Sequence, residues 1–151
     1  MGIGVLLAKR SGVRPNCARH AHWGASLVIV MMFLHTLRVF FQGAYKKPRE
    51  MNWIVGVLIF MVMMGLGFTG YLLPWDMKAL FATKVGLQIA EATPLIGPAI
   101  KTLLAGDPEI VGAQTLTRFF AIHVFFLPAA LLGLMAAHFL MIRRQGISGP
   151  L

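Results

Sequence analysis

The sequence predicts an all-α membrane protein, and three observations carry this prediction. Hydrophobic residues make up 58% of the 151 residues and charged residues only 13%, which is far more apolar than an ordinary soluble domain. Three apolar runs are long enough to cross a bilayer, which takes about 20 residues. The last two of these runs contain no charged residue. We therefore expect one membrane domain with transmembrane helices at 24–41, 53–75 and 119–142.

The segment 1–21 precedes the first expected helix and is predicted to lie outside the membrane domain, which then covers 22–151. Its apolar stretch is surrounded by Lys9, Arg10, Arg14 and Arg19. This stretch is too short to span a membrane, and the segment fits a signal peptide poorly. No transmembrane helix is expected before residue 24.

The segment 76–118 connects the second and third expected spans and is interrupted by several Pro and Gly residues. Two pieces of it, 77–91 and 95–105, show apolar residues at helical spacing. We expect both pieces to be short helices on the membrane surface.

The cationic residues predict how the spans are oriented. Lys46, Lys47 and Arg49 lie between the first two spans, and Arg143 and Arg144 follow the third. Because cytoplasmic loops carry an excess of Lys and Arg, both segments are expected on the cytoplasmic side of the cell membrane. The segment 76–118, with mixed charges, is then external in a multi-pass protein.

Charge and cysteine content exclude two other classes. The net charge of +9 is dispersed around apolar runs, which argues against a nucleic-acid partner. Cys17 is the only cysteine, and no Cys-x-x-Cys-His motif is present to attach a c-type haem.

The histidines point to the chemistry. His123 and His138 lie fifteen residues apart in one uncharged span. On a regular helix they are about 60° apart in azimuth and about 22 Å apart along the axis, so they share a face at two depths. With His35 in the first span, this pattern is typical of axial ligands to haem iron held between helices. A single intramembrane histidine is as often a packing residue, and a proton or metal relay in a small transporter is the competing function.

Gly56 and Gly70, fourteen residues apart in the second span, lie on nearly one face of the helix. They predict backbone notches that admit the edges of two flat macrocycles. Close helix packing is the alternative interpretation of these glycines.

Four motifs together resemble cytochrome b. They are WGAS at 23–26, GAYKKPRE at 43–50, GYLLPW at 70–75 and TLTRFFAIH at 115–123. The spacing of His123 and His138, and the end of the chain at Leu151, resemble the short, split form of that family. The resemblance implies a four-helix bundle with two b-type haems. It also implies three protein partners, which are a Rieske iron-sulfur protein, a c-type cytochrome and a second polypeptide that carries the remaining helices. The whole complex is expected to be dimeric.

The resemblance also implies roles for individual residues. His35 and His138 match the ligands of the inner haem, and His123 matches one ligand of the outer haem. Arg38 and Arg118 match the cations that meet haem propionates. No residue of this chain is expected to be catalytic by itself.

The implied reaction is oxidation of a quinol, expected to be menaquinol, in a quinol:cytochrome c oxidoreductase. One electron passes to the Rieske centre and the other inward through the haems, with protons released outside. Residues 70–75 and the surface helix with Phe81, Ala82 and Val85 are expected to form one wall of the outer quinol pocket.

The chain departs from the family pattern at its N-terminal end. The first transmembrane helix of the bundle is not visible, and Ala21 stands where the family places the second outer ligand. His20 is the better substitute on geometry, and His22 is the other candidate. We expect the segment before His22 to derive from a truncated or frame-shifted gene. A fragment that binds little haem is therefore an alternative interpretation of the chain. Of the two haem sites, the inner one, with both histidines present, is the more secure.

Overall fold

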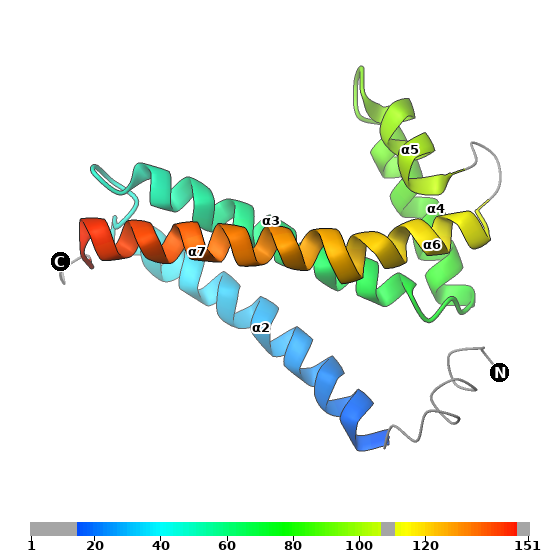
Figure 1. Cartoon of the computed structure of the whole chain (residues 1–151), viewed down its shortest axis with the longest axis horizontal. Coiled ribbons are helices and arrows are strands. Elements are labelled where there is room, and N and C mark those ends of the chain that lie inside the picture. The colour runs from blue at the N-terminus through cyan, green and yellow to red at the C-terminus, as the bar shows by residue number, and fades with distance from the viewer. Residues whose placement is uncertain (1–14, 107–110, 148–151) are drawn as a thin grey trace. The chain divides into compact units, whose positions relative to one another are not determined.

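The computed structural model describes residues 15–106 and 111–147, with residues 15–21 described as helical backbone. Every regular element in this part of the chain is a helix, which confirms the all-α fold class (Figure 1). The helices fall into two compact units. Unit I is Gly67–Phe126, and unit II combines Arg14–Leu66 with Leu127–Leu151.

Three helical segments are long and apolar enough to cross a membrane, as the sequence predicts. They are His22–Phe41, Glu50–Leu72 and Ala113–Gln145. Their bounds differ from the predicted ones, and each difference has a local cause.

The first helix, α2, runs from Pro15 to Phe41 and so begins earlier than the predicted start at Gly24. Proline is favoured at the first position of a helix, because its fixed φ suits the helix and its missing N–H has no partner there. Part of the segment predicted to lie outside the domain is therefore helical, while residues 1–14 lie outside the described residues.

The second helix, α3, runs from Glu50 to Leu72 instead of from Trp53 to Trp75. Glu50 in the first turn interacts favourably with the helix dipole. The helix ends early because Pro74 disfavours the helical conformation at the residue before it. Trp75 then has a positive φ of 50°.

The third span is interrupted, although the sequence predicts one continuous helix at 119–142. It consists of α6 (Ala113–Ala121), a π-helical turn η1 (Ile122–Phe126) and α7 (Leu127–Gln145). Pro128 has no N–H to donate to the preceding turn, and a π turn is a common adjustment around such a position.

Unit I contains the two short helices predicted from the segment 76–118. The helix α4 covers Met77–Glu91, and α5 covers Gly97–Ala105, two residues shorter at its start than predicted. Asp76 caps α4 by accepting a 2.8 Å hydrogen bond from the Ala79 backbone N–H. Thr115 donates a 2.7 Å hydrogen bond to the Ala105 carbonyl, which ties α6 to the end of α5.

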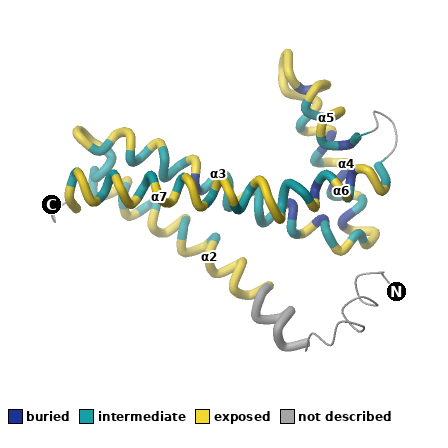
Figure 2. The backbone as a smooth tube through the Cα atoms, viewed as in Figure 1, coloured by how far each residue is buried: buried dark blue, intermediate teal, exposed yellow. Residues whose placement is uncertain are grey.

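The few fully buried side chains of the described residues lie mainly in unit I, as Figure 2 shows. Phe119 is buried and packs edge-on against Phe68 at 6.5 Å between ring centroids. A Cβ at Gly86 would lie 2.6 Å from the tip of the Phe68 ring, so a larger residue at this position of α4 would require that ring to shift. Phe68 of α3 is thereby in contact with both α6 and α4.

In unit II, aromatic contacts and one arginine hold the helix ends. Tyr45 stacks on Phe40 of α2 and contacts Trp53 of α3, with centroids 5.6 and 5.7 Å apart. Arg49 donates hydrogen bonds to the carbonyls of Gly146 and Ile147, at 3.4 and 3.1 Å. The loop before α3 is thus bonded to the residues that follow α7.

The helices α2 and α7 are largely exposed along their length (Figure 2). None of the most apolar window of α2 is buried. Exposed apolar helices of this length are what contact with lipid or with partner helices requires.

Candidate functional site

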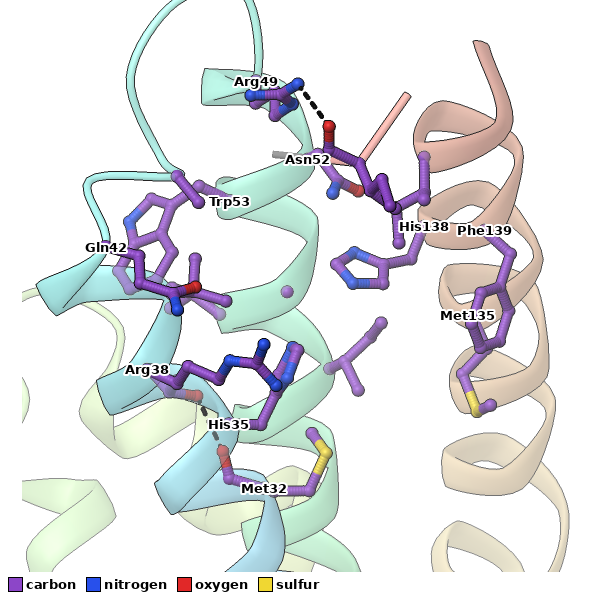
Figure 3. Close-up of a pocket in the computed structure, with 18 of the residues that line it drawn as sticks. Met32, His35, Arg38, Gln42, Arg49, Asn52, Trp53, Met135, His138 and Phe139 are labelled. Atoms are coloured by element: carbon purple, nitrogen blue, oxygen red, sulfur yellow. Dashed lines mark hydrogen bonds between the residues drawn. The ribbon is translucent and has the colours of Figure 1, made fainter. Parts of the chain in front are cut away.

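A cavity of about 430 Å³ lies within unit II and is lined by α2, α3 and α7. Two of the predicted histidines reach it from different helices, His35 from α2 and His138 from α7. Figure 3 shows both imidazoles directed into this space. Its volume lies in the range of ordinary ligand and cofactor sites.

Gly56 of α3 creates the room that His138 occupies. A Cβ at this position would lie 3.3 Å from Cε1 and 3.9 Å from Nδ1 of the imidazole. The notch predicted at Gly56 therefore receives the histidine ring in this structure. Any larger side chain at this position would push the ring away from α3.

Two buried polar atoms at this cavity have no hydrogen-bond partner among the described residues. They are Nδ1 of His138 and Oδ1 of Asn52. Both residues line the cavity, and Figure 3 shows them on the same side of it. Buried polar atoms are nearly always paired, so these two mark a site that a ligand or a small rearrangement completes.

Arg38 lies three residues after His35 and also lines the cavity. It is exposed, as is His35, and makes no ion pair with a carboxylate among the described residues. An arginine without an acidic partner at an otherwise apolar cavity is suited to bind an anionic group.

Unit I holds the third predicted histidine. His123 lies in η1, and its Nδ1 shares a hydrogen bond of 2.9 Å with Oγ1 of Thr69 on α3. A Cβ at Gly70 would lie 2.9 Å from the His123 Cε1 atom, which is closer than real Cβ contacts come. Gly70 therefore also accommodates an imidazole, and Thr69 leaves Nε2 as the unpaired ring nitrogen within the described residues.

Arg118 has partners within unit I. Its guanidinium donates to the carbonyls of Thr102, at 3.0 Å, and Leu103, both in the last turn of α5. In this structure Arg118 satisfies carbonyls at a helix end, a position where cations are favourable.

The other residues singled out from the sequence are placed as follows. Phe81 and Val85 of α4 are exposed, and Lys84 lies 5.9 Å from the Phe81 ring centroid. His22 is exposed and contacts Trp23 edge-on at 6.5 Å. The side chains of Cys17, His20 and Ala21 lie outside the described residues.

Thr69 and Asn52 are the site residues that sequence reasoning missed. Thr69 is a polar residue in an uncharged span, directly before Gly70, and this position is the feature of the sequence that could have indicated its role. Asn52 lies one turn before Gly56, at the polar end of α3, where an amide side chain is common and does not indicate a site. The hydrogen bond to His123 reveals Thr69, and the position of an unpaired amide oxygen at the cavity reveals Asn52.

The chemistry of this arrangement suits a haem. A haem iron needs only two axial protein ligands, because the macrocycle supplies four. Paired histidines, an apolar cavity and an unpaired arginine fit such a group.

Comparisons with known proteins agree with this interpretation. Residues 26–151 match the family described as Cytochrome b(N-terminal)/b6/petB. The chain is 98% identical over 130 residues to a menaquinol:cytochrome c reductase cytochrome b subunit of Geobacillus thermodenitrificans, and 92% identical to the protein so named in Bacillus subtilis. Each alignment covers 86% of this chain and 58% of the relative.

More distant matches extend the comparison. Cytochrome b6 of Synechocystis is 48% identical over 129 residues, which cover 85% of this chain and 58% of the relative. A chain of a hyperthermophilic respiratory Complex III has a TM-score of 0.73 and 33% identity, covering 87% of this chain and 36% of that one. The chain thus spans 58% of the length of these curated relatives.

Proposed function

The chain belongs to the cytochrome b/b6 N-terminal family, as its motifs predict, and on that premise we propose that it carries haem b and electrons in a menaquinol:cytochrome c reductase. One observation carries the proposal. His35 and His138 line one cavity of about 430 Å³ from two different helices. Facing histidines are the axial ligands that a haem held within a helix bundle requires.

Haem b is the cofactor that the family implies, and when bound it supplies an iron centre that gains and loses one electron reversibly. The residues present fit it. Imidazole nitrogens are available from two helices, and Gly56 keeps the His138 ring close to α3. The cavity walls between them are mainly apolar, with Met32, Val39 and Phe139 among the lining residues.

The roles of the unit II residues follow from this fit. His35 and His138 would hold the haem iron, and the surrounding apolar side chains would exclude water from it. Arg38 neutralises a haem propionate. Two arginines line the cavity, Arg38 and Arg49, and the exposed guanidinium of Arg38 is suited to bind an anionic group. Arg49 is already bonded to backbone carbonyls.

Unit I supplies half of a second haem site. His123 is held against Gly70 and bonded to Thr69, which orients its ring for coordination. Ala21 stands where the family places the second ligand, and His20 and His22 are the candidate replacements. We expect this outer site to bind haem more weakly than the inner site. We also expect Arg118 to reach a haem propionate only after its guanidinium has left the carbonyls at the end of α5.

The partners of the complex belong to the same proposal. They are a Rieske iron-sulfur protein, a c-type cytochrome and a second polypeptide that completes the bundle, together with quinol and quinone in the cytoplasmic membrane. The exposed apolar faces of α2 and α7 offer contact surface for helices and lipid. Phe81 and Val85 are exposed on α4, as a wall of the outer quinol pocket requires.

A reduced-minus-oxidised spectrum of membranes that contain the chain tests the proposal. We expect a b-type band in the parent chain and loss of the inner haem in His138→Ala, because the iron then keeps a single axial histidine. Leu132→Ala is the matched control, since Leu132 is an exposed apolar residue of the same helix. A blank spectrum of the parent chain, or full haem content in His138→Ala, would contradict the assignment.

A further inference from the structure

Nδ1 of His138 and Oδ1 of Asn52 are both buried and both unpaired among the described residues. An amide oxygen only accepts hydrogen bonds, and Nδ1 of a neutral imidazole donates one whenever Nε2 is the coordinating nitrogen. One buried donor and one buried acceptor at the same cavity are chemically complementary.

The helix α3 brings the two groups to the same place. Asn52 precedes Gly56 by four residues, and residues four apart share a helix face. The Cβ position of Gly56 lies 3.3 Å from Cε1 and 3.9 Å from Nδ1 of His138, so the ring edge with these two atoms lies against α3. Asn52 and His138 line the same cavity.

Unit I contains such an arrangement already formed. There Thr69, a polar residue of α3 beside Gly70, shares its 2.9 Å hydrogen bond with Nδ1 of His123. In unit II, Gly56 of α3 likewise admits an imidazole, and Asn52 of α3 lines the same cavity as that ring.

We propose that Asn52 is a positioning residue for His138, whose Oδ1 accepts the Nδ1–H hydrogen bond and so reserves Nε2 for the haem iron. This inference rests on the proposed haem-binding function. Histidines that bind metals usually donate their other N–H to such an acceptor, which fixes the tautomer and makes the ligand more basic. The backbone carbonyl of the same residue is the competing acceptor.

The pair Asn52→Thr and Asn52→Val tests the proposal, because the two side chains have the same shape and differ in one hydroxyl group. Valine removes the acceptor, while threonine provides the group that Thr69 uses in unit I. In the full chain in membranes, we expect Asn52→Val to weaken haem binding at the inner site about 10- to 100-fold. Asn52→Thr should stay within a fewfold of the parent.

The midpoint potential of the inner haem gives a readout that packing alone does not move. A less basic ligand stabilises ferric iron less, so Asn52→Val should raise the potential, and Asn52→Thr should restore it. Each tenfold change in the ratio of ferric to ferrous affinity corresponds to about 59 mV for one electron. Gln145→Met is the control, because it removes another buried, unpaired amide oxygen of unit II that does not line the cavity.

The outcomes separate the two proposals. Equal affinity and potential in the parent, Asn52→Val and Asn52→Thr would overturn the role of the Asn52 side chain and assign the bond to its backbone carbonyl. Equal losses in Asn52→Val and Asn52→Thr would also overturn it, since the hydroxyl then has no effect. Retention of the inner haem in His138→Ala would instead refute the haem site itself.

Discussion

Gly70→Ala adds one methyl group at the place where unit I has least room for it. The new Cβ would lie 2.9 Å from Cε1 of His123, so either the ring or the α3 backbone has to move. Overpacking of this kind costs about 1–3 kcal/mol, while replacing a helical glycine by alanine returns about 0.5–1 kcal/mol. We expect a net destabilisation of roughly 1–2 kcal/mol.

The displaced ring also loses its 2.9 Å hydrogen bond to Thr69, so the effect should include the haem held by His123. The assay is thermal unfolding of the purified chain, together with its haem content and spectrum. Destabilisation by this amount lowers the unfolding temperature by about 2–8 °C in a protein of this size.

Three other glycines provide a graded control for the same change. A Cβ at Gly133 meets nothing within 4 Å, one at Gly65 lies 3.7 Å from Leu127, and one at Gly56 lies 3.3 Å from His138. Stability should therefore fall in the order Gly133→Ala, Gly65→Ala, Gly56→Ala and Gly70→Ala. If Gly70→Ala unfolds at the same temperature as Gly133→Ala and keeps the parent spectrum, the steric reasoning is refuted.

Three further predictions concern the segments outside the cavity. Arg118→Gln should loosen the end of α5 by about 1–2 kcal/mol, because two carbonyls lose a charged donor, and limited proteolysis near Gly106 should become faster. Asp76→Ala should destabilise α4 by about 1 kcal/mol through loss of its cap, measured by thermal unfolding, whereas Asp76→Asn should cost much less. A reporter fused after Arg144 should be cytoplasmic and one inserted at Gly106 external, and the reverse result would contradict the orientation inferred from charge.

Much of the fold could be predicted because hydrophobic length and composition determine whether a segment spans a membrane. The number of spans and the helix Met77–Glu91 follow from these patterns alone. The ends of the helices depend on local backbone chemistry instead. Pro15 extends the first helix, Pro74 ends the second early, and Pro128 accompanies a π turn in the third.

The histidines proposed as ligands can be picked out from the sequence, whereas the residues beside them cannot. Intramembrane histidines and glycines at matching intervals are unusual enough to be noticed in a sequence. Asn52 and Thr69 carry no such periodicity, and their significance depends on which ring lies opposite them. Arg118 was assigned to a propionate from the resemblance, whereas its contacts with α5 require knowledge of where α5 ends.

The hydrogen bonds from Arg49 to Gly146 and Ile147 have a consequence for the order of events during synthesis. They join residues 97 and 98 positions apart, and His138 is contributed by the same late segment. Until α7 is synthesised, one of the three helices that line the cavity is missing. At the proposed haem site, haem binding is therefore expected to follow the synthesis of α7.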